Sequence, residues 1–257
     1  MLHDVLRNYR CYLESKYSPA TARTYAIRLA VLFKGQKLTA FETGLDFDKI
    51  LKNLSAFHYK NPFSQAKNAL LHYCSFQNIP LSDEILNTIK DLESNTHKKY
   101  RHLKVVDYRQ VEKTIQSLKN KKLRLSYQVM ASTGLRVAEL AGIRPSDCTI
   151  SKDHITFKFT AKGGNTETVV LAEDEYSALY QNIKELLDNT PPKKKLFYSA
   201  IHLQIQAKKL GFTCHDLRRA FAKLTYKKSR SKTEVMKLLR QASLKNTNIY
   251  LRSRIKL

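Results

Sequence analysis

The sequence predicts a mainly α-helical protein with a small antiparallel β-hairpin or sheet, built as a helical domain followed by an α+β domain. Three observations lead to this prediction. At 257 residues the chain is longer than the usual single domain. Apolar residues recur at helical spacing along most of it. Only residues 155–171 show a clear period of two, interrupted by a Gly-containing turn.

Residues 1–95 are predicted to form the helical domain. Its first helix carries an apolar stripe that includes Tyr9 and Leu13. The second helix should begin at Ser18-Pro19, since serine caps an N-terminus and proline fits the first helical position. The same reasoning predicts three further helices, which begin near Asp46, Asn61 and Ser82.

Residues 96–104 lose this periodicity and become polar and basic, which is typical of an exposed linker. We therefore expect the second domain to span 105–257. A linker of this charge would lie along a DNA backbone, and its candidate phosphate contacts are Lys98, Lys99 and Arg101.

The second domain should open with a helix capped by Asp107, followed by a helix that ends at Gly134, a residue suited to the left-handed C-terminal conformation. A β-hairpin with its turn at 161–165 comes next. Beyond it, helices are predicted over 173–187 and across the strongly basic stretch 207–257.

Charge indicates the partner. The chain has 46 basic and 22 acidic residues, a formal net charge of +24, which disfavours a compact chain by self-repulsion unless a polyanion offsets it. Nucleic acid is the natural candidate. No apolar run approaches the roughly 18 residues of a membrane span. The N-terminus lacks the apolar core of a signal peptide, so we expect a cytoplasmic protein without membrane association.

The four cysteines argue against a metal centre. Cys11, Cys74, Cys148 and Cys214 are far apart and form no ligand motif with histidine. We expect reduced, mostly packed thiols, with no disulfide, no bound metal and no cofactor.

Several side chains suit phosphate chemistry, although each also has an ordinary structural explanation. A basic residue can be an ion-pair partner, a turn residue or a surface charge, and a tyrosine can pack on a helix. His215 and Arg218 would project from one face of a helix. The whole set comprises Arg136 (with Glu139 as a candidate ion-pair partner), Lys162, His215, Arg218, Gln241 and Tyr250.

The order of these residues changes their interpretation. The segments STGLRVAEL, AKGG, HDLRRAFA and LLRQASLKNTNIY follow one another as in the catalytic domain of the tyrosine recombinase (phage integrase) family, which residues 105–250 resemble. The first domain, with SPATARTYAIRLAVLF, resembles the core-binding domain of that family more loosely. The resemblance implies a clamp on duplex DNA, and four protomers that exchange strands through a Holliday junction without metal or ATP.

The resemblance also implies roles. Tyr250 would attack a DNA phosphodiester to form a 3′-phosphotyrosine. Arg136 and Arg218 would hold the non-bridging oxygens. Lys162 would protonate the departing 5′-oxygen, and His215 would contact the phosphate and exchange the tyrosine proton.

The sequence departs from the family pattern in places. Gln241 stands where His or Trp is usual, with Arg240 where Gly is common. A glutamine amide can donate a hydrogen bond to a phosphate but cannot supply a cation or pass a proton, so we expect a slower or differently tuned enzyme that is still active. Only LRSRIKL follows Tyr250, which leaves little to dock on a neighbouring subunit. Arg219 and Lys245 are further candidate DNA-backbone contacts.

Two other functions remain open at this point. A type IB topoisomerase-like enzyme uses similar Arg, Lys, His and Tyr chemistry but relaxes supercoils as a monomer. A catalytically weak or silent DNA-binding relative is the second alternative, and Gln241 is the only argument for it.

Overall fold

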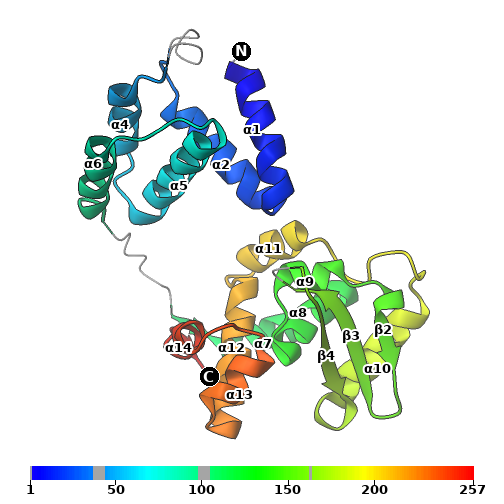
Figure 1. The fold of residues 1–257 in the computed structure, drawn as a ribbon. Helices are drawn as coiled ribbons and strands as arrows, with labels where there is room; N and C mark the ends of the chain where they lie inside the picture. The colour runs from blue at the N-terminus through cyan, green and yellow to red at the C-terminus, as the bar shows by residue number, and fades with distance from the viewer. Residues whose placement is uncertain (1, 37–43, 98–104, 162–163) are drawn as a thin grey trace. The chain divides into compact units, whose positions relative to one another are not determined.

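The computed structural model describes residues 2–36, 44–97, 105–161 and 164–257, and the chain divides into two compact units, 1–102 and 103–257 (Figure 1). Each unit has its own hydrophobic core. The architecture is mostly helical with a small antiparallel sheet, as the sequence predicts.

The first unit is helical. Its described helices are α1 (Leu2–Lys16), α2 (Pro19–Leu32), α4 (Phe47–Ser55), α5 (Lys60–Phe76) and α6 (Asp83–Ser94). Three predicted caps are confirmed: the side chains of Ser18, Asp46 and Ser82 accept hydrogen bonds from backbone N–H groups of the first turn that follows. The helix expected to begin at Asn61 starts one residue earlier, at Lys60.

The core of this unit is apolar. Tyr9, Leu29, Phe33, Leu54 and Leu70 are all fully buried in it. The buried Tyr9 hydroxyl donates to the Ala69 carbonyl oxygen at 3.1 Å. Burial of apolar surface is therefore the main stabilising force here.

The second unit combines helices with two small sheets. Its helices are α7 (Tyr108–Gln116), α8 (Lys121–Thr133), α9 (Val137–Gly142), α10 (Glu173–Asp188), α11 (Ala200–Lys209), α12 (Cys214–Ser229), α13 (Lys232–Leu238) and α14 (Leu244–Leu251). Its strands are β1 (Val106–Asp107), β2 (Cys148–Ile150), β3 (His154–Thr160), β4 (Thr166–Ala172) and β5 (Ile255–Lys256).

The larger sheet contains the predicted hairpin. Strands β3 and β4 are antiparallel, with Ile155 opposite Leu171 and Phe157 opposite Val169, and β2 adds a third strand that the sequence analysis did not anticipate. The alternating residues Ile155, Phe157 and Leu171 are fully buried against the helices. The period of two was therefore interpreted correctly.

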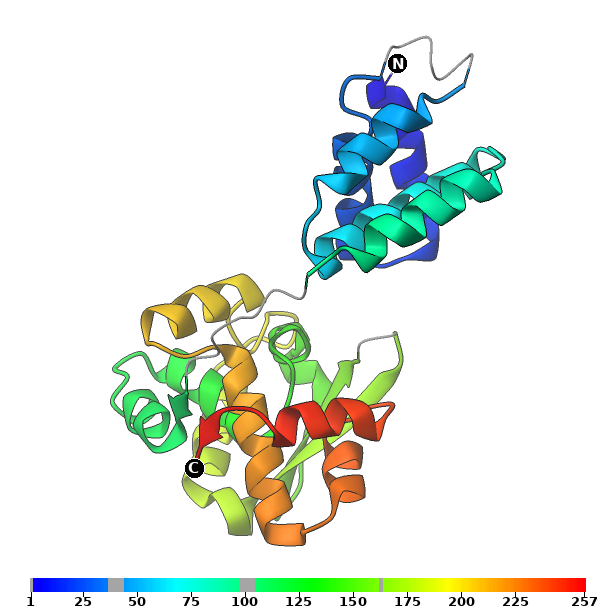
Figure 2. The same ribbon diagram turned by 90° about the vertical axis from the view of Figure 1, so that its left-hand side faces the viewer.

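The C-terminal segment returns to the start of the second unit. Strand β5 pairs in parallel with β1, and the Lys223 side chain of α12 donates to the Ile255 carbonyl oxygen at 2.8 Å. Figure 2 shows α14, in red, crossing α12, in orange, just before this strand. The pairing fixes the chain that follows α14.

The expectation of mostly packed thiols needs correction, and that of the Asp107 cap is confirmed. Cys74 and Cys214 are buried, but Cys11 is exposed on α1, so the thiols are not uniformly packed. Asp107 caps α7 as predicted, accepting from the Arg109 and Gln110 backbone N–H groups. Among the described helices, none is long and apolar enough to cross a bilayer.

Candidate active site

The loop between α8 and α9 places the first arginine. Helix α8 ends at Gly134 in the left-handed conformation, φ 64°, as predicted. A side chain is excluded there by space as well, because a Cβ would lie 2.5 Å from the Phe221 ring. The chain then turns so that Arg136 becomes the N-cap of α9.

Glu139 orients this arginine. Its carboxylate accepts from the Arg136 backbone N–H at 2.7 Å and from the Arg136 guanidinium at 2.6 Å. Glu139 is only 3% exposed, whereas Arg136 keeps 28% of its side chain exposed. The ion pair suggested by the sequence therefore exists, and it holds a guanidinium that still faces solvent.

Helix α12 supplies His215 and Arg218. Its start is fixed by a capping box, since Thr213 and Asp216 each accept from the other's backbone N–H, at 3.2 and 2.9 Å. The His215 and Arg218 side chains lie on one side of the first two turns of α12. Arg218 is 1% exposed, and its two Nη atoms donate to the Gly134 and Leu239 carbonyl oxygens. Its Nε has no hydrogen-bond partner among the described residues.

Helix α14 brings Tyr250 to the same place. The Tyr250 ring centroid lies 5.1 Å from that of His215, and the Arg218 guanidinium carbon lies 5.8 Å from it. Tyr250 also packs beside Phe221 on the small cluster of Ala222, Val235 and Leu239. Three of the predicted residues, from two helices, thus meet around one phenol ring.

Gln241 is connected to the tyrosine helix by a contact that the sequence analysis missed. The Thr247 hydroxyl, fully buried on α14, donates to the Gln241 side-chain oxygen at 2.8 Å. This bond occupies the amide oxygen, so the N–H groups of Gln241 are left as its hydrogen-bond donors. A threonine one turn before a candidate nucleophile was the only sequence signal for it.

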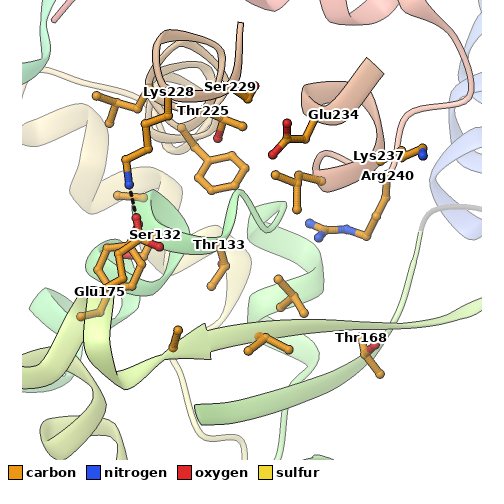
Figure 3. A pocket seen from close by; sticks show the side chains of 18 of the residues that line it. Ser132, Thr133, Thr168, Glu175, Thr225, Lys228, Ser229, Glu234, Lys237 and Arg240 are labelled. Atoms are coloured by element: carbon orange, nitrogen blue, oxygen red, sulfur yellow. Dashed lines mark hydrogen bonds and ion pairs between the residues drawn. The ribbon is translucent and has the colours of Figure 1, made fainter. Parts of the chain in front are cut away.

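A cavity of about 330 Å³ lies in front of these groups. Its lining includes Arg136, Thr213, His215 and Arg218. A larger cavity of about 600 Å³ lies between β4, α12 and α13 and is lined by none of Arg136, His215 and Arg218 (Figure 3). The smaller cavity is therefore the one that combines positive charge with a candidate proton acceptor.

The electrostatics of the site follow from burial and from like charges. Partial enclosure of the imidazole, followed by the charges of Arg219 and Arg218, lowers the pKa of His215 from 6.5 to about 4, although the residue as a whole is exposed to solvent. Histidine is therefore neutral at pH 7. Burial and the nearby Arg136 lower the pKa of Arg218 to about 10, so this guanidinium remains charged at neutral pH.

The remaining candidates are placed differently. Arg219 is paired with Asp216 at 2.9 Å, and Lys245 is exposed on the first turn of α14. Lys162, Lys98, Lys99 and Arg101 lie outside the described residues. Strands β3 and β4 pair up to Thr160 and Thr166, on either side of Lys162, so the hairpin that carries it is present.

No cluster of three or more His, Cys, Asp or Glu side chains suited to a metal ion occurs within the described ranges. The groups that converge here are instead two guanidiniums, an imidazole and a phenol. This combination suits an anionic substrate attacked by a hydroxyl.

Solved structures share the fold. A lambda integrase dimer bound to a COC′ core site superposes with a TM-score of 0.71, at 17% identity over 98% of this chain and 95% of that one. A lambda integrase tetramer bound to a Holliday junction superposes with a TM-score of 0.68, at 18% identity over 98% and 78% of the two chains. The chain therefore has the fold of lambda integrase.

Sequence comparison gives the same class. Tyrosine recombinase XerA of Pyrococcus horikoshii is 25% identical over 96% of this chain and 88% of its own length. XerA of Saccharolobus solfataricus is 27% identical over 58% of this chain, and that match spans only 52% of the archaeal protein. The model of the phage integrase family matches residues 104–256, and the chain belongs to this family of DNA breaking and rejoining enzymes.

Proposed function

We propose that this chain is a site-specific recombinase that cleaves and rejoins duplex DNA through a 3′-phosphotyrosine on Tyr250. The observation that carries the proposal is the convergence of His215 and Arg218 on the Tyr250 ring, at 5.1 and 5.8 Å. Family membership and the fold shared with DNA-bound recombinases support the same reading.

In the cleavage step, the Tyr250 oxygen would attack the phosphorus of the scissile phosphodiester. A new P–O bond forms to tyrosine, and the bond to the 5′-oxygen breaks. His215, neutral at pH 7 because its pKa is lowered to about 4, is suited to accept the phenol proton. Lys162 would protonate the 5′-oxygen, which leaves as a hydroxyl. Attack by a 5′-hydroxyl of another strand reverses these events and frees Tyr250.

Two guanidiniums would stabilise the pentacoordinate phosphate. Arg136 is partly exposed beside the cavity, and Glu139 holds it in orientation. Arg218 lines the same cavity, and its contacts to the Gly134 and Leu239 carbonyl oxygens fix the guanidinium plane. Gln241 would add a neutral donor. Preorganised donors of this kind lower the barrier because they need no rearrangement during reaction.

The domain roles are also proposals. Residues 1–95 would bind DNA, 96–104 would link the domains along the backbone, and 105–257 would perform the chemistry, the two domains closing as a clamp. The split at residues 102 and 103 is compatible with this division. Four protomers would act together through a Holliday junction, as the tetrameric lambda integrase neighbour suggests. The reaction would take place in the cytoplasm.

The test is covalent capture. The protein is incubated, with a chelator present, with nicked suicide substrates that tile its own genomic surroundings, and DNA-linked protein is separated on a denaturing gel. We expect an adduct with wild type and none with Tyr250→Phe. An adduct that survives this substitution would exclude Tyr250 as the nucleophile.

Two control reactions separate the alternatives. Relaxation of a supercoiled plasmid without a specific site, and without recombinant products, would favour a topoisomerase-like enzyme. Tight DNA binding with no adduct on any natural site would indicate a silent relative. Lys162→Ala should slow cleavage of a normal substrate but spare a 5′-phosphorothiolate one, because sulfur leaves without a proton.

A further inference from the structure

Arg240 is a buried cation at the edge of the active site to which the mechanism above assigns no role. It follows α13 with φ 51°, in the left-handed region. Its side chain is 10% exposed, lies 5.2 Å from the centre of the Phe159 ring, and extends from the end of α13 above β4 (Figure 3). The Nε atom is buried without a hydrogen-bond partner among the described residues.

Arg240 lies near the two acceptors that bind Arg218 and Arg136, the Gly134 carbonyl oxygen and the Glu139 carboxylate. Its Nη2 lies 3.4 Å from the Gly134 carbonyl oxygen, which also accepts from Arg218. The same Nη2 lies 4.0 Å from Glu139 Oε2, and Glu139 is the partner of Arg136. Arg240 therefore joins the anchors of both guanidiniums.

The charges of this group do not balance. Arg136 and Arg240 share the Glu139 carboxylate, Arg218 is bound by the Gly134 and Leu239 carbonyl oxygens, which carry no net charge, and His215 is neutral at pH 7. Burial lowers the pKa of Arg240, and Glu139 only partly opposes this effect. A buried excess of positive charge is costly without a counter-ion, so the arrangement favours binding of an anion.

We propose that Arg240 is a positioning residue of the cleavage reaction, acting through Glu139 and the Gly134 carbonyl. By sharing the Glu139 carboxylate, it leaves Arg136 with more net positive charge toward the DNA phosphate. By contacting Gly134, it steadies the carbonyl that anchors Arg218. This inference rests on the proposed function, since it concerns the same reaction. It also assigns a role to Arg240, which stands where glycine is common in the family.

The test compares charged and neutral substrates. Arg240→Met removes the charge while keeping most of the apolar stem, and Arg240→Lys keeps a charge without the planar fork. Adduct formation is timed on a normal scissile phosphodiester and on one with a methylphosphonate, which lacks one negative oxygen. We expect R240M to slow phosphodiester cleavage about 10- to 100-fold, less than loss of a direct donor. The methylphosphonate should slow about threefold or less, and R240K should recover part of the rate.

Lys237→Met is the matched control, because Lys237 is an exposed cation on α13, the helix that precedes Arg240, and lines the same cavity of about 600 Å³. It should behave as wild type. Equal slowing of both substrates by R240M would mean that Arg240 only maintains the structure, and no slowing would overturn its role altogether. Melting curves of all variants identify any that fail to fold.

A second measurement separates failure of this inference from failure of the proposed function. If wild type forms no adduct, the proposed chemistry is wrong, but the charge excess can still be tested by calorimetric titration with inorganic phosphate. R240M should then bind phosphate several-fold more weakly than wild type and K237M. Equal affinities would overturn the inference.

Discussion

The two compact units bury different kinds of side chain. In the described part of the first unit, buried residues such as Leu29, Ile50 and Leu70 are apolar. The second unit buries Glu139, Asp216 and Arg218 as well. Burying charge costs free energy unless each group is paired, so a fold does not gain stability from it in general. The buried charges of the second unit are therefore explained by the proposed DNA cleavage reaction, and packing alone does not account for them.

The largest effect expected from this comparison is on Arg218. In Arg218→Lys a point charge replaces the fork that joins Gly134 and Leu239, and the phosphate loses a bidentate donor. Adduct formation on a suicide substrate should fall by about 10²- to 10³-fold. Arg124→Lys, a change on α8 at a residue that contacts the Leu118 carbonyl, should leave the rate unchanged. A wild-type rate in R218K would show that this buried charge is structural.

In the first unit, a core truncation should act on stability alone. Leu70 is fully buried on α5, and Leu70→Ala should cost about 2–5 kcal/mol through lost contacts and a cavity. Chemical denaturation monitored by circular dichroism would measure this. Ile27→Ala, at a residue that is 52% exposed on α2, should cost much less. Below the melting transition, L70A should form adduct at the wild-type rate per folded molecule. A slower rate would show that the core of the first unit also affects the reaction.

A buried hydroxyl should have a smaller effect. Thr247→Val removes the donor to Gln241 while nearly preserving shape, so it should cost about 1 kcal/mol, a factor of about five. If the bond orients the amide toward phosphate, cleavage should slow by a similar factor. Ser126→Ala, which removes a buried hydroxyl bonded to the Lys122 carbonyl on α8, should lower stability without slowing cleavage. Identical rates for T247V and S126A would remove Gln241 from phosphate binding.

The smallest expected effect is a pH dependence of stability. The pKa of His215 is about 4 in the fold against 6.5 ordinarily, so below pH 6.5 the unfolded chain binds more protons than the folded one. Stability should therefore fall as the pH drops from about 7 toward 5, and less so in His215→Gln, as read from melting temperatures. Parallel curves for the two proteins would mean that the positive surroundings of His215 do not disfavour its charge.

Much of the fold could be predicted because its signals are local. Ser18, Asp46 and Ser82 cap helices through hydrogen bonds to the turn that follows, and Gly134 ends one through its own conformational freedom. Helix α11 was missed because its pattern is weak: Ile201 and Ile205 are exposed, and Leu203 faces the core. The pairing of β1 with β5 was missed because two-residue strands carry no periodic signal.

The sequence by itself determined the helical class, the hairpin, the basic character of the chain and the identity of the residues that would act on a phosphate. Spacing along a helix could relate His215 to Arg218, since both belong to α12. Only the tertiary structure brought Tyr250 beside them, linked Gln241 to Thr247, and joined Arg136, Arg218 and Arg240 through Glu139 and Gly134. The physical reason is that burial and charge coupling depend on groups distant in the chain, which no local pattern records.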